Sequence, residues 1–313
     1  LAREATGEEL PIYTVAEKIL SDGEALRPDW EVHGTTGYEF LSETNGLFID
    51  PAGLRQLRRL YARITGMREP LREVVHDAKT LIMNTTMSSE LGVLADALAR
   101  IARGDRHTRD FTLNSLRELL IGYVACIPVY RTYVSPRGWT EEDERIIDRT
   151  IADARRRNPA MEGSLFRFLR SVLLPDRAGS DDAGGETMRA RRQAFAMKLQ
   201  QYTGPVQAKG VEDTAFYRYN VLVSETEVGG EPGRAVHSAD HVHACNANRA
   251  ARHPLEMTAL STHDTKFGED VRARVNVLSE IPDEWRDTLS RVLRATAGAR
   301  VRMAGTWAPD RND

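Results

Sequence analysis

The sequence predicts an α/β protein in which strand-like segments flank a long helical tract. The first segment is the β-branched and aromatic run from Ile12 to Val15, and the second is the short apolar run at 259–260 that precedes Ser261. Between them, from about residue 51 to residue 202, apolar residues recur at three- and four-residue intervals, as on one face of a helix. No repeat with a fixed period of about 20 to 50 residues is present, which argues against a solenoid.

The composition is that of a globular protein that has no strong field of either charge sign. The chain has 313 residues, 41% of them hydrophobic, and a net charge of −3 from 43 basic and 46 acidic residues. This balance gives no attraction for nucleic acid or for an anionic membrane. Cys126 and Cys245 fit no disulfide framework, and no apolar run of about 18 residues is present. We therefore expect a protein of the reducing cytoplasm, and no cofactor is indicated.

The segment from residue 11 to residue 20 ends in a candidate catalytic carboxylate. Its β-branched and aromatic run suits a buried parallel strand, and Glu17 falls at the end of that strand. Polar residues at the carboxyl ends of strands are the usual reactive groups of a β/α barrel. Alternatively, Glu17 and Lys18 form only an exposed ion pair, which would contribute little.

The helical tract divides at recognisable start and stop signals. A helix is expected from Pro51, with Gly66 at its C-cap, and Thr140 with Asp143 resembles a capping box. The other expected helices span residues 70–103 with a break near 84–86 and Gly104 as the stop, then 112–126, 140–157, 163–174 and 186–202, with a loop at 177–185.

The segment from Thr203 to Asn220 combines charged residues with aromatic ones. Lys209, Glu212, Asp213 and Arg218 lie among glycines and aromatic or hydroxylated side chains. Carboxylates and guanidinium groups bind sugar hydroxyls, and aromatic rings pack on the apolar faces of sugars. The same residues also suit a solvated turn that leads into a helix burying Phe216 and Tyr219, and the composition favours neither interpretation.

A second candidate carboxylate follows the apolar run at 259–260. His263, Asp264 and Lys266 come directly after it, so Asp264 and Glu17 would converge at one face of a barrel. Two convergent carboxylates suggest glycoside chemistry, in which one protonates the leaving oxygen and another stabilises positive charge at the sugar carbon. Alternatively, Asp264 is a helix cap or a structural hydrogen-bonding partner of His263.

A non-catalytic interpretation concerns a cluster of possible metal ligands. His237, His241, His243 and Cys245 fall within nine residues and could converge on a metal ion in a helical binding module. No second ligand pair with zinc spacing accompanies them, so we expect no metal site.

Seven motifs, in order along nearly the whole chain, resemble the maltooligosyl trehalose synthase family of the α-amylase superfamily. They are Val15–Leu20, Gly34–Phe40, Asn45–Phe48, Pro128–Tyr133, Thr203–Asn220, Glu227–Gly230 and Ser261–Lys266. The resemblance implies the C-terminal half of an α-amylase-type (β/α) barrel with a large all-helical insertion. Residues 1–50 and 203–313 would be barrel segments, and residues 51–202 would be the insertion.

The resemblance also implies a reaction and roles for individual residues. The family are isomerases that convert the reducing-end α-1,4 bond of a maltooligosaccharide to an α,α-1,1 bond by a retaining mechanism. Glu17 matches the general acid/base and Asp264 the transition-state-stabilising carboxylate. The matched substrate-binding positions are His263, Lys209, Glu212, Asp213, Lys266, Tyr217 and Arg218.

The chain also departs from the family pattern. The catalytic nucleophile of the superfamily is an Asp in an Arg-x-Asp-His-like motif, and the 313 residues contain no such motif. We therefore expect an internal fragment, lacking the N-terminal part of the barrel and the C-terminal region, that is inactive alone. Gln207 and Phe267-Gly268 replace the usual Met and Arg-Ser. Another glucanotransferase or hydrolase of the superfamily would share Glu17, His263 and Asp264, but not the full 203–220 motif.

Overall fold

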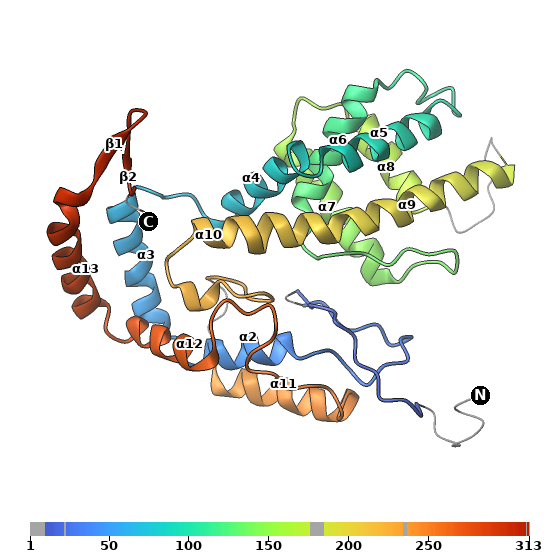
Figure 1. Ribbon diagram of the computed structural model, residues 1–313. Helices are drawn as coiled ribbons and strands as arrows, with labels where there is room; N and C mark the ends of the chain where they lie inside the picture. The colour runs from blue at the N-terminus through green and yellow to red at the C-terminus, as the bar shows by residue number, and fades with distance from the viewer. Residues whose placement is uncertain (1–9, 22, 176–184, 234–236, 311, 313) are drawn as a thin grey trace. The chain divides into compact units, whose positions relative to one another are not determined.

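The computed structural model describes residues 10–21, 23–175, 185–233, 237–310 and 312 (Figure 1). The chain divides into two compact units, one made of residues 1–71 and 216–313 and the other of residues 72–215. The expected loop at 177–185 lies outside the described residues, apart from Gly185, which begins a helix. None of the helices in the described ranges is both long and apolar enough to cross a lipid bilayer.

The unit of residues 72–215 is built of helices around one apolar core. Its helices are α4 (Leu71–Asn84), α5 (Ser88–Ala102), α6 (Leu113–Cys126), α7 (Glu141–Arg157), α8 (Gly163–Leu173), α9 (Gly185–Gln207) and the π-helix η1 (Ala208–Ala215). Leu98, Leu119, Leu120 and Leu169 are fully buried in the core that these helices share. The apolar periodicity of the sequence therefore predicts this unit well.

Local capping signals set most of the helix ends as predicted. Thr112 caps α6 by accepting a hydrogen bond from the Ser115 amide at 3.1 Å. The Thr140 capping box is confirmed, because the Asp143 amide donates to Thr140 Oγ1 at 3.1 Å and the Thr140 amide donates to Asp143 Oδ2 at 3.0 Å. The predicted break between α4 and α5 is also confirmed.

Helix α9 continues beyond the predicted end at residue 202. It runs through Pro205 to Gln207 and passes directly into η1, although Thr203-Gly204-Pro205 reads as a helix stop. Tertiary contacts stabilise the helix at this point. Gln200 is buried and accepts from the Val134 amide at 2.7 Å, and Thr203 Oγ1 donates to the Tyr130 carbonyl at 2.8 Å. Wider π-type turns follow the proline, and such turns accommodate a break in the regular hydrogen-bond ladder.

The other unit combines helices with irregular segments. Its elements are α2 (Tyr38–Leu47), α3 (Pro51–Thr65), α10 (Phe216–Arg218), η2 (Val223–Glu225), α11 (Ala239–Arg252), α12 (Glu269–Asn276), η3 (Val277–Ser279), α13 (Pro282–Thr296), η4 (Ala297–Ala299) and the antiparallel hairpin β1 (Val301–Met303) and β2 (Thr306–Ala308). The predicted C-cap Gly66 ends α3 with φ +82°, and Asp50, which was not predicted as a cap, caps its N-terminus. Leu54 and Leu57 of α3 pack with Ile49 and Leu222 in the core.

Neither predicted barrel strand forms a ladder among the described residues. Ile12 and Tyr13 are 66% and 57% exposed. The segment pairs in parallel with residues 33–36 through one bridge, between Ala16 and Thr35, and three backbone hydrogen bonds, which is too short for a regular strand. The prediction of a buried strand there is therefore wrong for this structure. A parallel strand is stable when neighbours flank it on both sides, and residues 33–36 pair along only one edge of this segment. The run before Ser261 is likewise irregular, so the barrel stays a prediction.

Along the chain, one unit passes into the other between residues 71 and 72 and between residues 215 and 216. The helical insertion predicted from the sequence spans residues 51–202. Helix α3 packs against η3 and α13, which places it in the unit of residues 1–71 and 216–313. Helix α9 passes without a break into η1, which places residues 203–215 in the helical unit.

Lys79 carries a buried amine in the core of the helical unit. Its Nζ donates to the Ile127 carbonyl at 2.8 Å, and its backbone packs against Gly210, where a Cβ atom would lie 2.8 Å from Lys79 Cγ. Burial lowers the pKa of Lys79 to about 7, and the nearby Cys126 thiol opposes this shift. The amine is therefore close to its titration point at neutral pH.

We predict that Lys79 makes the stability of the chain depend on pH. Between pH 7 and 10.5 the unfolded chain binds a proton that the folded chain lacks, so the free energy of unfolding rises with pH, by about 1 kcal/mol per unit at most. Lys79→Met should flatten this slope in urea unfolding at several pH values, and exposed Lys198→Met should not. An unchanged slope in Lys79→Met would contradict the assignment.

Candidate active site

The structure brings together Glu17, His263 and Asp264. His263 Nε2 lies 3.2 Å from Glu17 Oε1 and 3.5 Å from Asp264 Oδ1. Their side chains are 54%, 71% and 40% exposed for Glu17, His263 and Asp264, so all three are open to a ligand. Glu17 follows the bridge residue Ala16, and the other two lie in the loop before α12. An imidazole between two accessible carboxylates can exchange protons and bind hydroxyl groups.

Tyr38 orients one of these carboxylates. It is the first residue of α2 and is buried, and its hydroxyl donates to Asp264 Oδ2 at 2.7 Å. Burial raises the pKa of Tyr38 above its usual value, so the phenol stays protonated and remains a donor. No role was predicted for Tyr38 from the sequence, although it lies in the Gly34–Phe40 motif.

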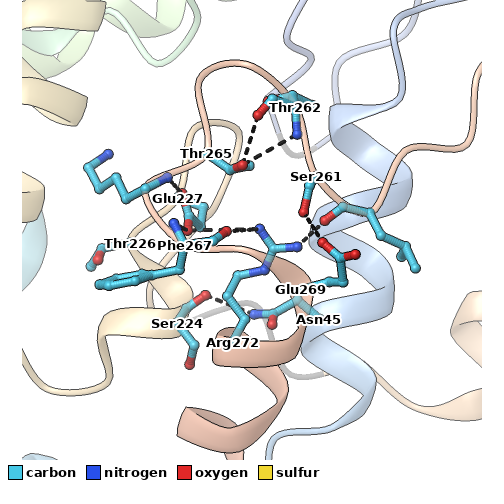
Figure 2. A network of polar contacts seen from close by, with 12 residues as sticks. Asn45, Ser224, Thr226, Glu227, Ser261, Thr262, Thr265, Phe267, Glu269 and Arg272 are labelled. Carbon is cyan, nitrogen blue, oxygen red and sulfur yellow. Dashed lines mark hydrogen bonds and ion pairs between the residues drawn. The ribbon is translucent and has the colours of Figure 1, made fainter.

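The loop from residue 260 to residue 268 is held by polar contacts (Figure 2). Within it, Thr265 Oγ1 donates to the Thr262 carbonyl at 2.9 Å, and the Asp264 amide donates to Thr262 Oγ1 at 3.3 Å. Below it, the Glu227 carboxylate accepts from the amides of Lys266 and Phe267 at 2.7 and 2.9 Å. The backbone around Asp264 is therefore fixed on both sides.

Helix α10 carries two predicted binding residues, Tyr217 and Arg218, and a third, Lys266, lies beside it. Lys266 Nζ lies 5.4 Å from the ring centroid of Tyr217 and 5.7 Å from that of Phe216. Phe216 is buried, whereas Tyr217 is 63% exposed and presents an aromatic surface to solvent. The Arg218 side chain is also exposed, while its carbonyl accepts from Tyr61 at 3.0 Å. This part of the 203–220 motif therefore has a feature of each interpretation. Phe216 is buried, as expected for a structural helix, and the Tyr217 ring is accessible, as expected for sugar binding.

The remaining predicted binding residues lie on η1 in the helical unit. Lys209 and Asp213 are exposed, whereas Glu212 is buried and accepts a hydrogen bond from Tyr130. The motif is therefore helical here, not a solvated turn. Short stretches of π-helix occur frequently at functional sites, because they displace side chains from the regular helical positions. The Pro128–Tyr133 motif was identified from the sequence, but the contact between Tyr130 and Glu212 was not predicted.

Possible metal ligands gather at the same place as the candidate carboxylates. Within the described ranges, one group of three ligand atoms converges to within 4.8 Å, and it is Glu17, His263 and Asp264. In the alternative set, the rings of His237 and His241 stack at 4.5 Å and Cys245 Sγ lies 3.5 Å from His241 Nε2. This set brings no three ligand atoms together in the part of the chain that the structure describes.

Comparison with known proteins assigns the chain to a group of relatives. No family model matches it. A protein of Mycobacterium tuberculosis named maltooligosyl trehalose synthase is 34% identical over 273 residues, which cover 87% of this chain and 32% of that protein. The structure of maltooligosyltrehalose synthase from Arthrobacter ramosus superimposes with a TM-score of 0.75 at 32% identity, over 95% of this chain and 34% of that one. The chain is related to the maltooligosyl trehalose synthases.

A second solved structure supports the relationship. It is a hypothetical maltooligosyl trehalose synthase from Sulfolobus tokodaii, with a TM-score of 0.67 at 29% identity, over 93% of this chain and 34% of that one. The chain therefore spans about a third of the length of the synthases that it matches. The resemblance seen in the sequence motifs is thus confirmed over that length.

We predict that Tyr130 stabilises the helical unit through Glu212. Tyr130→Phe removes a donor to a buried carboxylate and should lower the free energy of unfolding by about 1–3 kcal/mol. Urea denaturation followed by circular dichroism measures the change. Tyr217→Phe, whose side chain is exposed, is the matched control and should shift stability by less than about 0.5 kcal/mol. Equal effects of the two substitutions would contradict the role of the Tyr130 hydroxyl.

Proposed function

We propose that this chain supplies part of the active site of an enzyme that isomerises the reducing end of maltooligosaccharides. The reaction would convert the terminal α-1,4 bond to an α,α-1,1 bond and form a maltooligosyl trehalose. The observation that carries the proposal is the convergence of Glu17, His263 and Asp264 in a chain related to maltooligosyl trehalose synthases. Substrate and product share the α configuration, so two inversions through a covalent glycosyl-enzyme are expected.

Glu17 would act as the general acid and then as the general base. It would protonate the leaving glycosidic oxygen and later accept a proton from the anomeric hydroxyl of the released glucose. Its accessible carboxylate and its contact with His263 Nε2 at 3.2 Å support this role. The imidazole could bind a sugar hydroxyl while it orients the carboxylate.

Asp264 would remain ionised and stabilise the positive charge that develops at the sugar carbon. The Tyr38 hydroxyl donates to Asp264 Oδ2 at 2.7 Å, and this contact would hold the carboxyl group in place. The transferred sugar must not meet water before glucose turns over within the site, so the site must also exclude solvent. None of the 313 residues is assigned as nucleophile.

The binding residues would use two kinds of contact with glucose units. The accessible ring of Tyr217, with Lys266 beside it, suits the apolar face of a sugar. His263, Arg218, Lys209, Glu212 and Asp213 are proposed to contact hydroxyl groups.

We expect substitution of either carboxylate to abolish most of the activity of the full-length enzyme. Glu17→Gln should lower kcat by about 10²–10⁴-fold, because the glutamine amide cannot transfer the proton, and Asp264→Asn should have an effect of similar size. Assays follow the loss of reducing ends from maltopentaose. Asp283→Asn, at an exposed ion pair on α13, is the control. Full activity in Glu17→Gln would contradict the assignment, and release of free glucose as the main product would favour a hydrolase.

Residues 1–313 expressed alone are expected to be inactive on maltopentaose. The covalent step requires a nucleophile, and the chain lacks the Arg-x-Asp-His-like motif that provides it in the superfamily. Chromatography of the products is the measurement. Trehalose-capped product formed by this chain alone would show that the covalent step uses a residue within it.

A further inference from the structure

We propose that the segment Glu227-Val228-Gly229-Gly230 is a positioning element that holds Asp264 from two sides. The inference rests on the proposed role of Asp264 in catalysis. The segment lies between η2 and α11 and carries no residue of the candidate active site itself. Its two contacts, one with the loop backbone and one with Tyr38, each end close to Asp264.

The first contact is made by the Glu227 carboxylate (Figure 2). Its two oxygens accept separately, Oε2 from the Lys266 amide at 2.7 Å and Oε1 from the Phe267 amide at 2.9 Å. The Glu227 side chain is only 2% exposed. Hydrogen bonds to an ionised acceptor are stronger than neutral ones, and a two-pronged contact fixes direction as well as distance. The backbone two and three residues after Asp264 is therefore fixed in place.

Arg272 completes this contact from α12. Its guanidinium Nη1 lies 3.8 Å from Glu227 Oε1 and donates to the Phe267 carbonyl at 3.2 Å, while Nη2 donates to the Leu260 carbonyl. One buried cation thus binds the carbonyls at both ends of the loop and balances the charge of Glu227. A buried charge is tolerated when it is paired and hydrogen-bonded in this way.

The second contact depends on Gly229. This residue has φ +78°, and a Cβ atom there would lie 3.2 Å from Tyr38 Cβ and 3.3 Å from Ile19 Cγ2. Tyr38 therefore packs directly against the bare backbone of Gly229, and its hydroxyl reaches Asp264 Oδ2. At Gly230 a side chain would collide with the carbonyl oxygen of Glu225, so the chain can turn here only with glycine.

The two contacts restrain different parts of Asp264. Glu227 fixes the backbone that follows it, and Gly229 fixes the phenol that holds its carboxylate. A partly exposed aspartate would otherwise sample several rotamers, and small displacements of a catalytic group reduce rates steeply. The segment would therefore set the geometry of the transition-state contact without touching substrate.

The first test is Glu227→Gln in the full-length enzyme. The substitution keeps the shape but replaces one acceptor with a donor facing a backbone amide, and it leaves Arg272 without its counter-charge. We expect amide hydrogen exchange across residues 262–268 to accelerate about tenfold and kcat to fall about 10²-fold, with KM changed less than about threefold. Glu269→Gln is the matched control, because Glu269 is an exposed residue of α12 that bonds Ser261 in the same network.

Two further variants keep the test decisive if Glu227→Gln folds poorly. Glu227→Asp retains the charge and should recover part of the exchange protection and of kcat. Gly229→Ala strains the backbone and displaces Tyr38, so it should lower kcat while the Lys266 and Phe267 amides stay protected. Faster exchange with unchanged kcat, or no change in either, would overturn the proposal.

The failure of this proposal is distinguishable from the failure of the proposed function. Asp264→Asn is measured in parallel. If Asp264→Asn is inactive while Glu227→Gln and Gly229→Ala are fully active, the positioning role is wrong and the role of Asp264 stands. If Asp264→Asn is itself fully active, the catalytic role of Asp264 is wrong, and the positioning inference falls with it.

Discussion

The Glu227 carboxylate, bound to two consecutive backbone amides, fixes the loop that carries His263 and Asp264. Within the described residues this loop follows no regular strand, so no sheet ladder satisfies its amides. A buried carboxylate, balanced by Arg272, does so instead. Charge-assisted hydrogen bonds at low exposure are strong and directional, which suits a loop whose side chains must stay open to a ligand.

In the helical unit, side-chain contacts likewise hold a stretch of irregular backbone. Helix α9 passes through Pro205 into a π-helix, and the segment around residues 130–134 binds it at three points. Gln200, Thr203 and Glu212 each accept from or donate to this segment. A helix whose hydrogen-bond ladder is disturbed is therefore held by side chains from elsewhere in the same unit.

The extent to which the sequence predicts this structure follows from the range of each interaction. The capping box at Thr140, the Gly66 cap and the break after Asn84 depend on residues within four positions of one another, and all were predicted correctly. The contacts of Asp264 with Tyr38 and of Glu227 with Lys266 join residues 226 and 39 positions apart. No local pattern marks such pairs. The prediction of a buried strand at Ile12 was wrong for the same reason, because a strand requires neighbouring strands that composition does not reveal.

The buried amine of Lys79 has a consequence for chemical labelling. An uncharged amine is a good nucleophile, yet the fold withholds this one from solvent, whereas Lys198 and Lys209 of the same unit are exposed. An acylating reagent should therefore modify the exposed amines at once and reach Lys79 only when the helices separate. The rate of acylation at Lys79 would then report how often the helical unit opens.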